Sequence, residues 1–137
     1  MTDSLTLPND IQTVPQLNVF IDTFCEQLDV DMDTVASLNL ALEEAVVNVM
    51  EYAYPKGVGY VYITVESEGD SILFTLKDKG LPFDPTKKEE VDTTLPAEQR
   101  PIGGLGIHLV RRIMDEIVYD YKDGMNILKL KKNIKKQ

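Results

Sequence analysis

Two long stretches of the chain repeat their hydrophobic positions with the period of a helix. Between residues 14 and 28 the apolar side chains fall three or four positions apart, which predicts an amphipathic helix with Pro15 near its start. A second apolar stripe runs from Val35 to Ala53 and predicts a longer helix. Acidic residues suit the N-terminus of this second helix, and proline and glycine end it. These residues are Asp29, Asp31 and Asp33 before the stripe, and Pro55 to Gly59 after it.

Five shorter stretches alternate between apolar and polar side chains, as β-strands do. They are residues 4–7, 60–66, 72–77, 117–121 and 125–131. Gly69-Asp70 separates the second stretch from the third, and Asp123-Gly124 separates the last two, so each pair is predicted to form an antiparallel hairpin. The first stretch ends at Pro8-Asn9 and is expected to be an edge strand.

A polar segment without periodicity extends from about residue 84 to residue 101. Compact domains seldom carry a structureless loop longer than ~12–15 residues unless it is a functional lid or a disordered linker. We interpret it as a lid over a ligand. Gly103-Gly-Leu-Gly106 follows at once and is expected to open a third helix, in which Leu109 and Ile113 are apolar.

The order of these elements predicts an α+β fold. We expect a two-layer sandwich in which three helices cover one face of a mixed, mainly antiparallel five-stranded sheet. A length of 137 residues is that of one domain, so residues 1–137 are expected to form a single domain.

Composition excludes several classes of protein. The net charge of −9 argues against a general nucleic-acid binder, because neutralising phosphates needs clustered lysine and arginine. The basic cluster Lys129, Lys131, Lys132, Lys135 and Lys136 is interpreted as a solvated edge strand and tail. A single cysteine and a single histidine leave neither a disulfide nor a zinc site. With no signal peptide and no apolar run near the ~18 residues of a membrane span, a cytoplasmic location is expected.

Candidate chemistry begins with Glu44 and Asn48 on the second helix. Residues four apart lie on one helix face, and the helical projection places this pair away from the apolar stripe. A carboxylate can act as a base, and an amide oxygen can ligate a hard cation. By itself the pair is weak evidence, because many surface helices carry such residues.

Two further motifs follow along the chain. Asp78-x-Gly80-x-Pro82 stands at the end of a predicted strand, and Gly103-Gly-x-Gly106 is a candidate phosphate cradle at a helix N-terminus. The glycine motif lacks the Lys-Ser/Thr of a P-loop, and no parallel βαβ unit surrounds it as in a Rossmann site. A tight junction between loop and helix is the alternative interpretation.

In this order the three motifs resemble the Bergerat nucleotide site of the GHKL ATPase superfamily. The sequence looks most like the anti-sigma-factor serine/threonine kinases of bacterial partner switching, and the resemblance runs from about Leu38 to Lys131. Flanking residues agree in Tyr52-Ala-Tyr-Pro55 and Met114-Asp-Glu116.

The resemblance implies ATP and Mg²⁺ as cofactors and assigns a role to each motif. Asn48 would hold Mg²⁺ against the phosphates, and Glu44 would be the general base. Asp78 would accept a hydrogen bond from the adenine amino group, and Gly80 would leave room for the base. Gly103, Gly104 and Gly106 would line the phosphates. We add Arg100 as a phosphate contact because guanidinium geometry suits phosphate, although a solvated lid arginine is an equal alternative.

The resemblance also implies a protein serine/threonine kinase that phosphorylates a small anti-sigma-antagonist-type protein. A sigma factor is a second expected partner, and a homodimer through the sheet or the first strand is a third expectation. The alternative function is a nucleotide-binding anti-sigma or regulatory module with little phosphotransfer. A histidine kinase core is disfavoured, because 137 residues leave no room for a dimerisation helix pair.

Three further positions depart from the family pattern or match no functional position in it. Glu51 stands where many relatives have histidine, and Asn126 is the nearest polar counterpart of a threonine in the last motif. His108 matches no functional position of the family and is expected on a helix surface.

Overall fold

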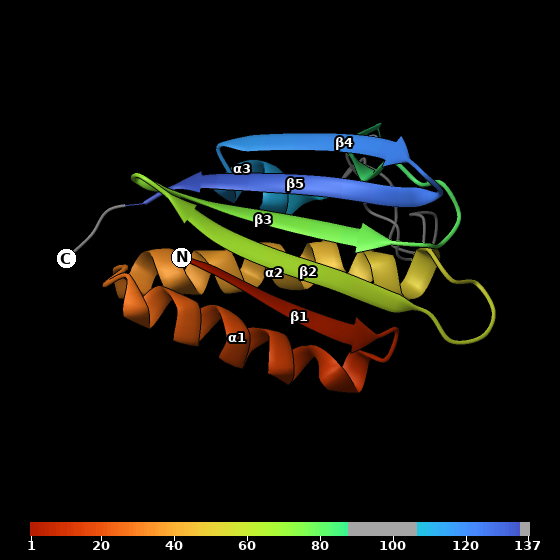
Figure 1. Cartoon of the computed structure of the whole chain (residues 1–137), viewed down its shortest axis with the longest axis horizontal. Helices are drawn as coiled ribbons and strands as arrows, with labels where there is room; N and C mark the ends of the chain where they lie inside the picture. The colour runs from red at the N-terminus through yellow and green to blue at the C-terminus, as the bar shows by residue number, and fades with distance from the viewer. Residues whose placement is uncertain (88–106, 135–137) are drawn as a thin grey trace, which may run out of the picture.

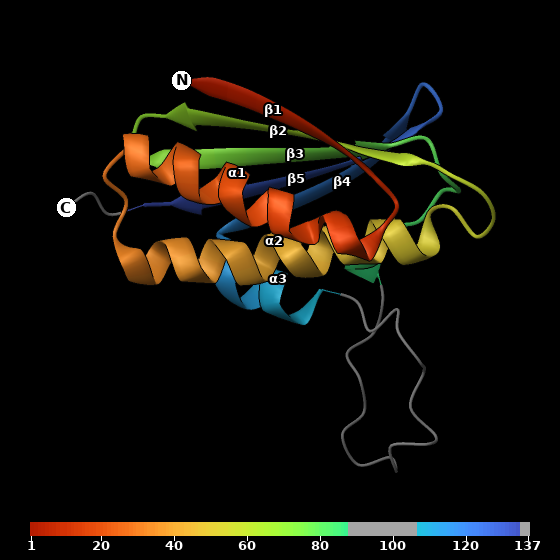
Figure 2. The same cartoon turned by 90° about the horizontal axis from the view of Figure 1, so that it is seen from below.

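The computed structural model describes residues 1–87 and 107–134, which form a layer of strands and a layer of helices (Figure 1). The strands are β1 (Thr2–Pro8), β2 (Tyr60–Glu68), β3 (Ser71–Asp78), β4 (Glu116–Lys122) and β5 (Met125–Asn133). The helices are α1 (Val14–Gln27), α2 (Met32–Tyr52) and α3 (His108–Ile113), with short 3-10 turns η1 (Ile11–Thr13) and η2 (Pro85–Lys87). All three helices lie on one side of the sheet (Figure 2). The predicted α+β sandwich is confirmed.

The sheet has the order β1-β2-β3-β5-β4, and each of its neighbouring pairs is antiparallel. The expectation of a mixed sheet is therefore wrong, because no connection in the described chain sets two neighbouring strands parallel. β1 is an edge strand, as predicted. β5 is not: it lies between β3 and β4, so its interpretation as a solvated edge strand is wrong. β5 pairs with β4 along one edge through their hairpin and with β3 along its other edge. The pairing with β3 joins segments far apart in the chain, so local sequence does not predict it.

Lysines of β5 point to both faces of the sheet. Lys131 Nζ lies 3.4 Å from a carboxylate oxygen of Glu116, and Lys132 Nζ donates to the carbonyl oxygen of Ile113 at 2.8 Å. Lys129 is exposed, and residues 135 and 136 lie outside the described part of the chain.

One hydrophobic core fills the space between the two layers. Alternate residues of the central strands are fully buried against the apolar stripes of α1 and α2, because strand side chains alternate between faces. Typical members are Val61, Ile63, Val65, Ile72, Phe74 and Leu76 of the sheet with Leu17, Ile21, Leu38, Leu42 and Val46 of the helices. Cys25 is also buried there, and burial raises the pKa of Cys25 to about 11.

Local signals in the sequence place the element ends. The side chain of Asp31 caps α2 by accepting a hydrogen bond from the backbone nitrogen of Thr34 at 2.7 Å. Asp123 and Gly124 both have positive φ, 56° and 77°, as a tight β4–β5 turn requires. Within residues 1–87 and 107–134, no helix has the length and apolar character needed to cross a bilayer.

Candidate functional site

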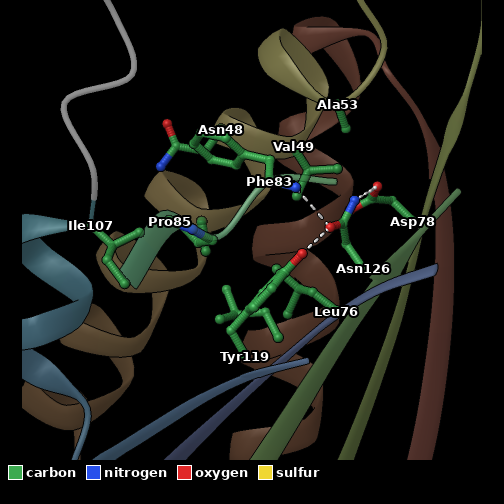
Figure 3. A pocket seen from close by; sticks show the side chains of 12 residues that line it. Asn48, Val49, Ala53, Leu76, Asp78, Phe83, Pro85, Ile107, Tyr119 and Asn126 are labelled. Carbon is green, nitrogen blue, oxygen red and sulfur yellow. Dashed lines mark hydrogen bonds between the residues drawn. The ribbon is translucent and has the colours of Figure 1, made fainter. Parts of the chain in front are cut away.

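A pocket lies between the C-terminal half of α2 and the end of the sheet where β3 stops and β5 begins (Figure 3). Most of its lining is apolar, and its polar groups come from α2, β3, β4 and β5. The lining residues are Ala45, Asn48, Val49 and Ala53 of α2, Leu76 and Asp78 of β3, Phe83, Pro85 and Ile107, Tyr119 of β4, and Asn126 and Leu128 of β5.

The pocket is a narrow slot in this structure. Its cavity volume is about 20 Å³, although about 390 Å³ of empty space, part of it open to solvent, lies between its walls. Ligand sites usually span roughly 300–1,000 Å³. Phe83 and Pro85 line it from the segment after β3, and the Phe83 ring stacks on Tyr52 with centroids 6.2 Å apart. A planar base would therefore need part of the lining to move aside.

A larger hollow between α1 and α2 is a poorer site for a phosphate ligand. It contains about 1160 Å³ of empty space, but three carboxylates, Asp22, Glu26 and Asp29, line it. Repulsion from these groups disfavours an anion there. Within the described residues, no group of three or more metal-ligating His, Cys, Asp or Glu side chains is found.

Asp78 is the charged group of the slot. It is only 4% exposed, and both of its hydrogen bonds within the described chain end on Oδ1, from Gly80 N and Asn126 Nδ2, each at 2.9 Å. Burial raises the pKa of Asp78, while the bonds from Asn126 and Gly80 oppose that rise. Oδ2 is thus the oxygen with capacity to accept a further hydrogen bond from a ligand.

Asn126 stands directly opposite Asp78 in the pairing of β3 with β5 and is 5% exposed. Its Nδ2 also donates to the carbonyl oxygen of Leu81 at 2.8 Å, and its Oδ1 accepts from Phe83 N at 3.0 Å and from the Tyr119 hydroxyl. In the sequence, Asn126 is recognisable only as the nearest polar counterpart of a threonine in the last motif. An available signal was the alternation of β5, which puts an amide on the same inward face as Leu128 and Leu130.

Asn48 lies at the opposite side of the slot from Asp78 (Figure 3). It is half-buried, and in Figure 3 its amide points away from Asp78 and Asn126. The structure therefore brings two of the predicted site residues, Asn48 and Asp78, to one pocket. Its two polar sides are suited to the two ends of a nucleotide.

Glu44 does not line the slot. Its Oε1 accepts hydrogen bonds from the backbone nitrogens of Leu109 at 3.0 Å and Val110 at 3.2 Å. These are the second and third residues of α3, whose N-cap residue, Ile107, offers no side-chain acceptor. A carboxylate at that position satisfies free N–H groups and the positive end of the helix dipole. Its side chain is half-buried between two helices, and its role as a base stays a prediction.

Close packing against Ala53 explains why residue 80 is a glycine. A Cβ atom added there would overlap the carbonyl oxygen and the Cβ of Ala53 at the C-terminus of α2. The adjacent backbone nitrogen of Leu81 donates to the same Ala53 oxygen at 2.9 Å. Gly80 itself does not line the slot, so its predicted contribution to base binding remains untested while its contribution to the α2–β3 junction is evident.

Several predicted site residues lie outside the described part of the chain. They are Arg100, Gly103, Gly104 and Gly106, together with most of the predicted lid. The described start of the lid, η2, is tied to α3 by a hydrogen bond from Arg111 Nη2 to the carbonyl oxygen of Thr86.

Neither His108 nor Glu51 lines the slot. His108 is half-buried rather than on a free surface, and its Nε2 atom is shielded from water without a partner among the described residues. Glu51 is exposed and absent from the slot lining, so it adds no carboxylate to the pocket wall.

Comparison with known proteins gives a family match over nearly the whole chain. Residues 7–132 match the model of the histidine kinase-like ATPase domain. The serine-protein kinase RsbW of Bacillus cereus strain AH187 is 30% identical over 103 residues, and that of Bacillus mycoides strain KBAB4 is 31% identical over 103 residues. Each alignment covers 72% of this chain and 64% of the relative, so the chain spans less than two thirds of these relatives' length.

A solved structure shares the fold. The crystal structure of the RsbU and RsbW domains of a Mycobacterium tuberculosis protein matches 98% of this chain with a TM-score of 0.69 and 14% sequence identity. The match uses 32% of that longer chain.

Proposed function

The chain belongs to the histidine kinase-like ATPase domain family, and from this premise we propose that it is an ATP- and Mg²⁺-dependent serine/threonine protein kinase. Its proposed substrate is a small anti-sigma-antagonist-type protein. Similarity to proteins named serine-protein kinase RsbW supports this class of activity. We also propose that the chain binds a sigma factor as a second partner and forms a homodimer. We further propose that it is a single domain located in the cytoplasm.

The observation that carries the proposal is the placement of Asp78 and Asn48 at two sides of one apolar slot. A buried carboxylate with an oxygen available is a selective acceptor for an amino group on a flat base. An amide oxygen at the other side suits a hard cation beside phosphates.

Each residue has a distinct proposed task. Asp78 Oδ2 accepts from the amino group of adenine, and Asn48 holds the metal ion. Mg·ATP, when bound, supplies the phosphoryl group and neutralises part of its charge. Gly103, Gly104, Gly106 and Arg100 are proposed to contact the phosphates.

Glu44 is proposed to take the proton of the substrate hydroxyl. Its bonds to α3 end on Oε1, so Oε2 is the oxygen assigned to this step. Positioning of the hydroxyl in line with the phosphate then supplies most of the rate.

A second candidate function is a nucleotide-dependent binding module with little phosphotransfer. The engagement of Glu44 with the start of α3 favours it, because a residue with this structural task is useful without catalysis. Labelled ATP incubated with the protein and an antagonist-type partner separates the two. Transfer to a serine or threonine supports the kinase, whereas binding without transfer supports the module.

A further inference from the structure

Asn126 uses every hydrogen-bonding position of its side chain within the protein. An amide has two N–H donors and a carbonyl oxygen with two lone pairs. The donors go to Asp78 Oδ1 and to the Leu81 carbonyl oxygen, and the oxygen accepts from Phe83 N and from the Tyr119 hydroxyl. No donor or acceptor is left for a ligand.

These partners also fix which way the amide points. The two groups beside Nδ2 are acceptors only, a carboxylate and a carbonyl oxygen, while a peptide N–H beside Oδ1 can only donate. A flipped amide would place oxygen against oxygen and N–H against N–H. The orientation is therefore determined by the network.

Three separate parts of the slot meet at this one side chain. It joins the end of β3 through Asp78, the segment after β3 through Leu81 and Phe83, and β4 through Tyr119. Figure 3 shows the amide between the Asp78 carboxylate and the Tyr119 hydroxyl. A buried, fully satisfied polar network of this kind holds its members in one geometry.

We propose that Asn126 is a positioning residue for base selection: by binding Asp78 Oδ1 and the backbone of Leu81 and Phe83, it keeps Oδ2 aimed at the amino group of a bound adenine. This inference rests on the proposed function. Asn126 acts through Asp78 and does not touch the base.

The selection follows from the chemistry of the acceptor. An adenine brings an N–H donor to Oδ2, whereas guanine brings a carbonyl oxygen and a purine without the amino group brings a C–H. A site built around a buried polar group rejects a ligand that leaves this group unpaired. Without the Asn126 donor, the carboxylate loses one of its two anchors, and burial raises the pKa of Asp78 with less opposition. A protonated Asp78 would no longer select for a donor.

The test measures the Kd of ATP and of purine riboside triphosphate, which lacks the 6-amino group, for the full chain and its variants. Asn126→Leu removes the amide at similar size, Tyr119→Phe removes one hydroxyl, and Asn126→Thr returns one donor and one acceptor. Asn133→Leu is the matched control, because it makes the same change at an exposed position of β5.

The ratio of the two Kd values is the decisive quantity, since general loosening of the fold weakens both ligands alike. We expect the unmodified chain and Asn133→Leu to prefer ATP by roughly tenfold or more, which is the order expected for one buried hydrogen bond. The preference should fall toward one in Asn126→Leu, fall partly in Tyr119→Phe, and recover in Asn126→Thr.

Two results would overturn the inference, and they are distinguishable. A chain that binds neither nucleotide removes the proposed function and this inference together. A chain that binds ATP and keeps its full preference in Asn126→Leu removes the inference alone. If Asn126→Leu does not fold, as judged by circular dichroism, Tyr119→Phe decides the same question, and a full preference for ATP in that variant would overturn the inference.

Discussion

Glu44 Oε1 lies 3.0 Å from the backbone nitrogen of Leu109, so the proposed base of α2 also holds the first turn of α3. The two residues are 65 positions apart in the sequence. A single carboxylate thereby links the stability of the helix pair to the proposed chemistry, and conservative substitutions can separate the two.

Glu44→Gln should abolish phosphotransfer while leaving most of the stability. The glutamine side chain keeps an oxygen that can accept from Leu109 and Val110, but it cannot take a proton. Glu44→Ala should abolish transfer and also lower the free energy of unfolding by about 1 kcal/mol, as loss of a helix cap does. Urea unfolding and labelled transfer measure the two effects. Transfer that survives in Glu44→Gln would exclude Glu44 as the base.

Asp78→Asn should prevent ATP binding without destabilising the fold near neutral pH. Its Oδ1 can still accept from Gly80 and Asn126, and the charge that burial disfavours is gone. Because the folded-state pKa of Asp78 is raised from 3.8, the carboxylate costs stability as pH rises through the folded pKa. The stability advantage of Asp78→Asn should therefore shrink as pH falls through the folded-state pKa of Asp78 toward 3.8. Urea unfolding at a series of pH values checks the sign, and an advantage that grows toward acid would contradict it.

Asn48→Ala should weaken Mg·ATP binding more than binding of ATP in EDTA. Removal of a metal ligand affects only the form that carries the ion, whereas contacts to the base are unchanged. Calorimetry with and without Mg²⁺ gives both constants. Equal losses in the two conditions would show that Asn48 supports the slot in another way.

Gly80→Ala should destabilise the protein by about 1–3 kcal/mol, the usual cost of overpacking. The new methyl group would overlap the carbonyl oxygen and Cβ of Ala53. Gly69→Ala is a useful comparison, since that glycine has open space around it but a φ of 60°. Thermal unfolding should rank Gly80→Ala as the more damaging change, and the reverse order would contradict the packing argument.

Cys25 should resist thiol reagents in the folded protein. It is fully buried, and a pKa of about 11 leaves little thiolate near neutral pH. Reaction with a chromogenic disulfide should therefore follow unfolding and accelerate with urea. Rapid labelling in native buffer would show that the core opens around α1.

The sequence was sufficient to predict the elements because their signals are local. Apolar spacing located α1 and α2, and Asp123-Gly124 located the last hairpin. The shared pocket of Asn48 and Asp78 was also predictable through the family motifs. These features depend on neighbours within a few residues or on a known pattern of motifs.

Contacts between distant segments were not predictable in this way. The hydrogen bonds of Glu44 depend on how α3 packs on α2, and the internal position of β5 depends on its pairing with β3. Asn126 acquires its importance only because that pairing sets it opposite Asp78. Its inward position in an alternating strand was a usable but ambiguous signal, since one polar residue on a buried face has many explanations.

The narrowness of the slot has a kinetic consequence. A base cannot occupy so small a cavity until part of its lining has moved, and Phe83 and Pro85 are the lining residues that belong to the segment after β3. Opening of one wall then precedes binding, as gating motions do in other enzymes. The observed association rate should level off at high nucleotide concentration, at a value set by the protein and not by diffusion.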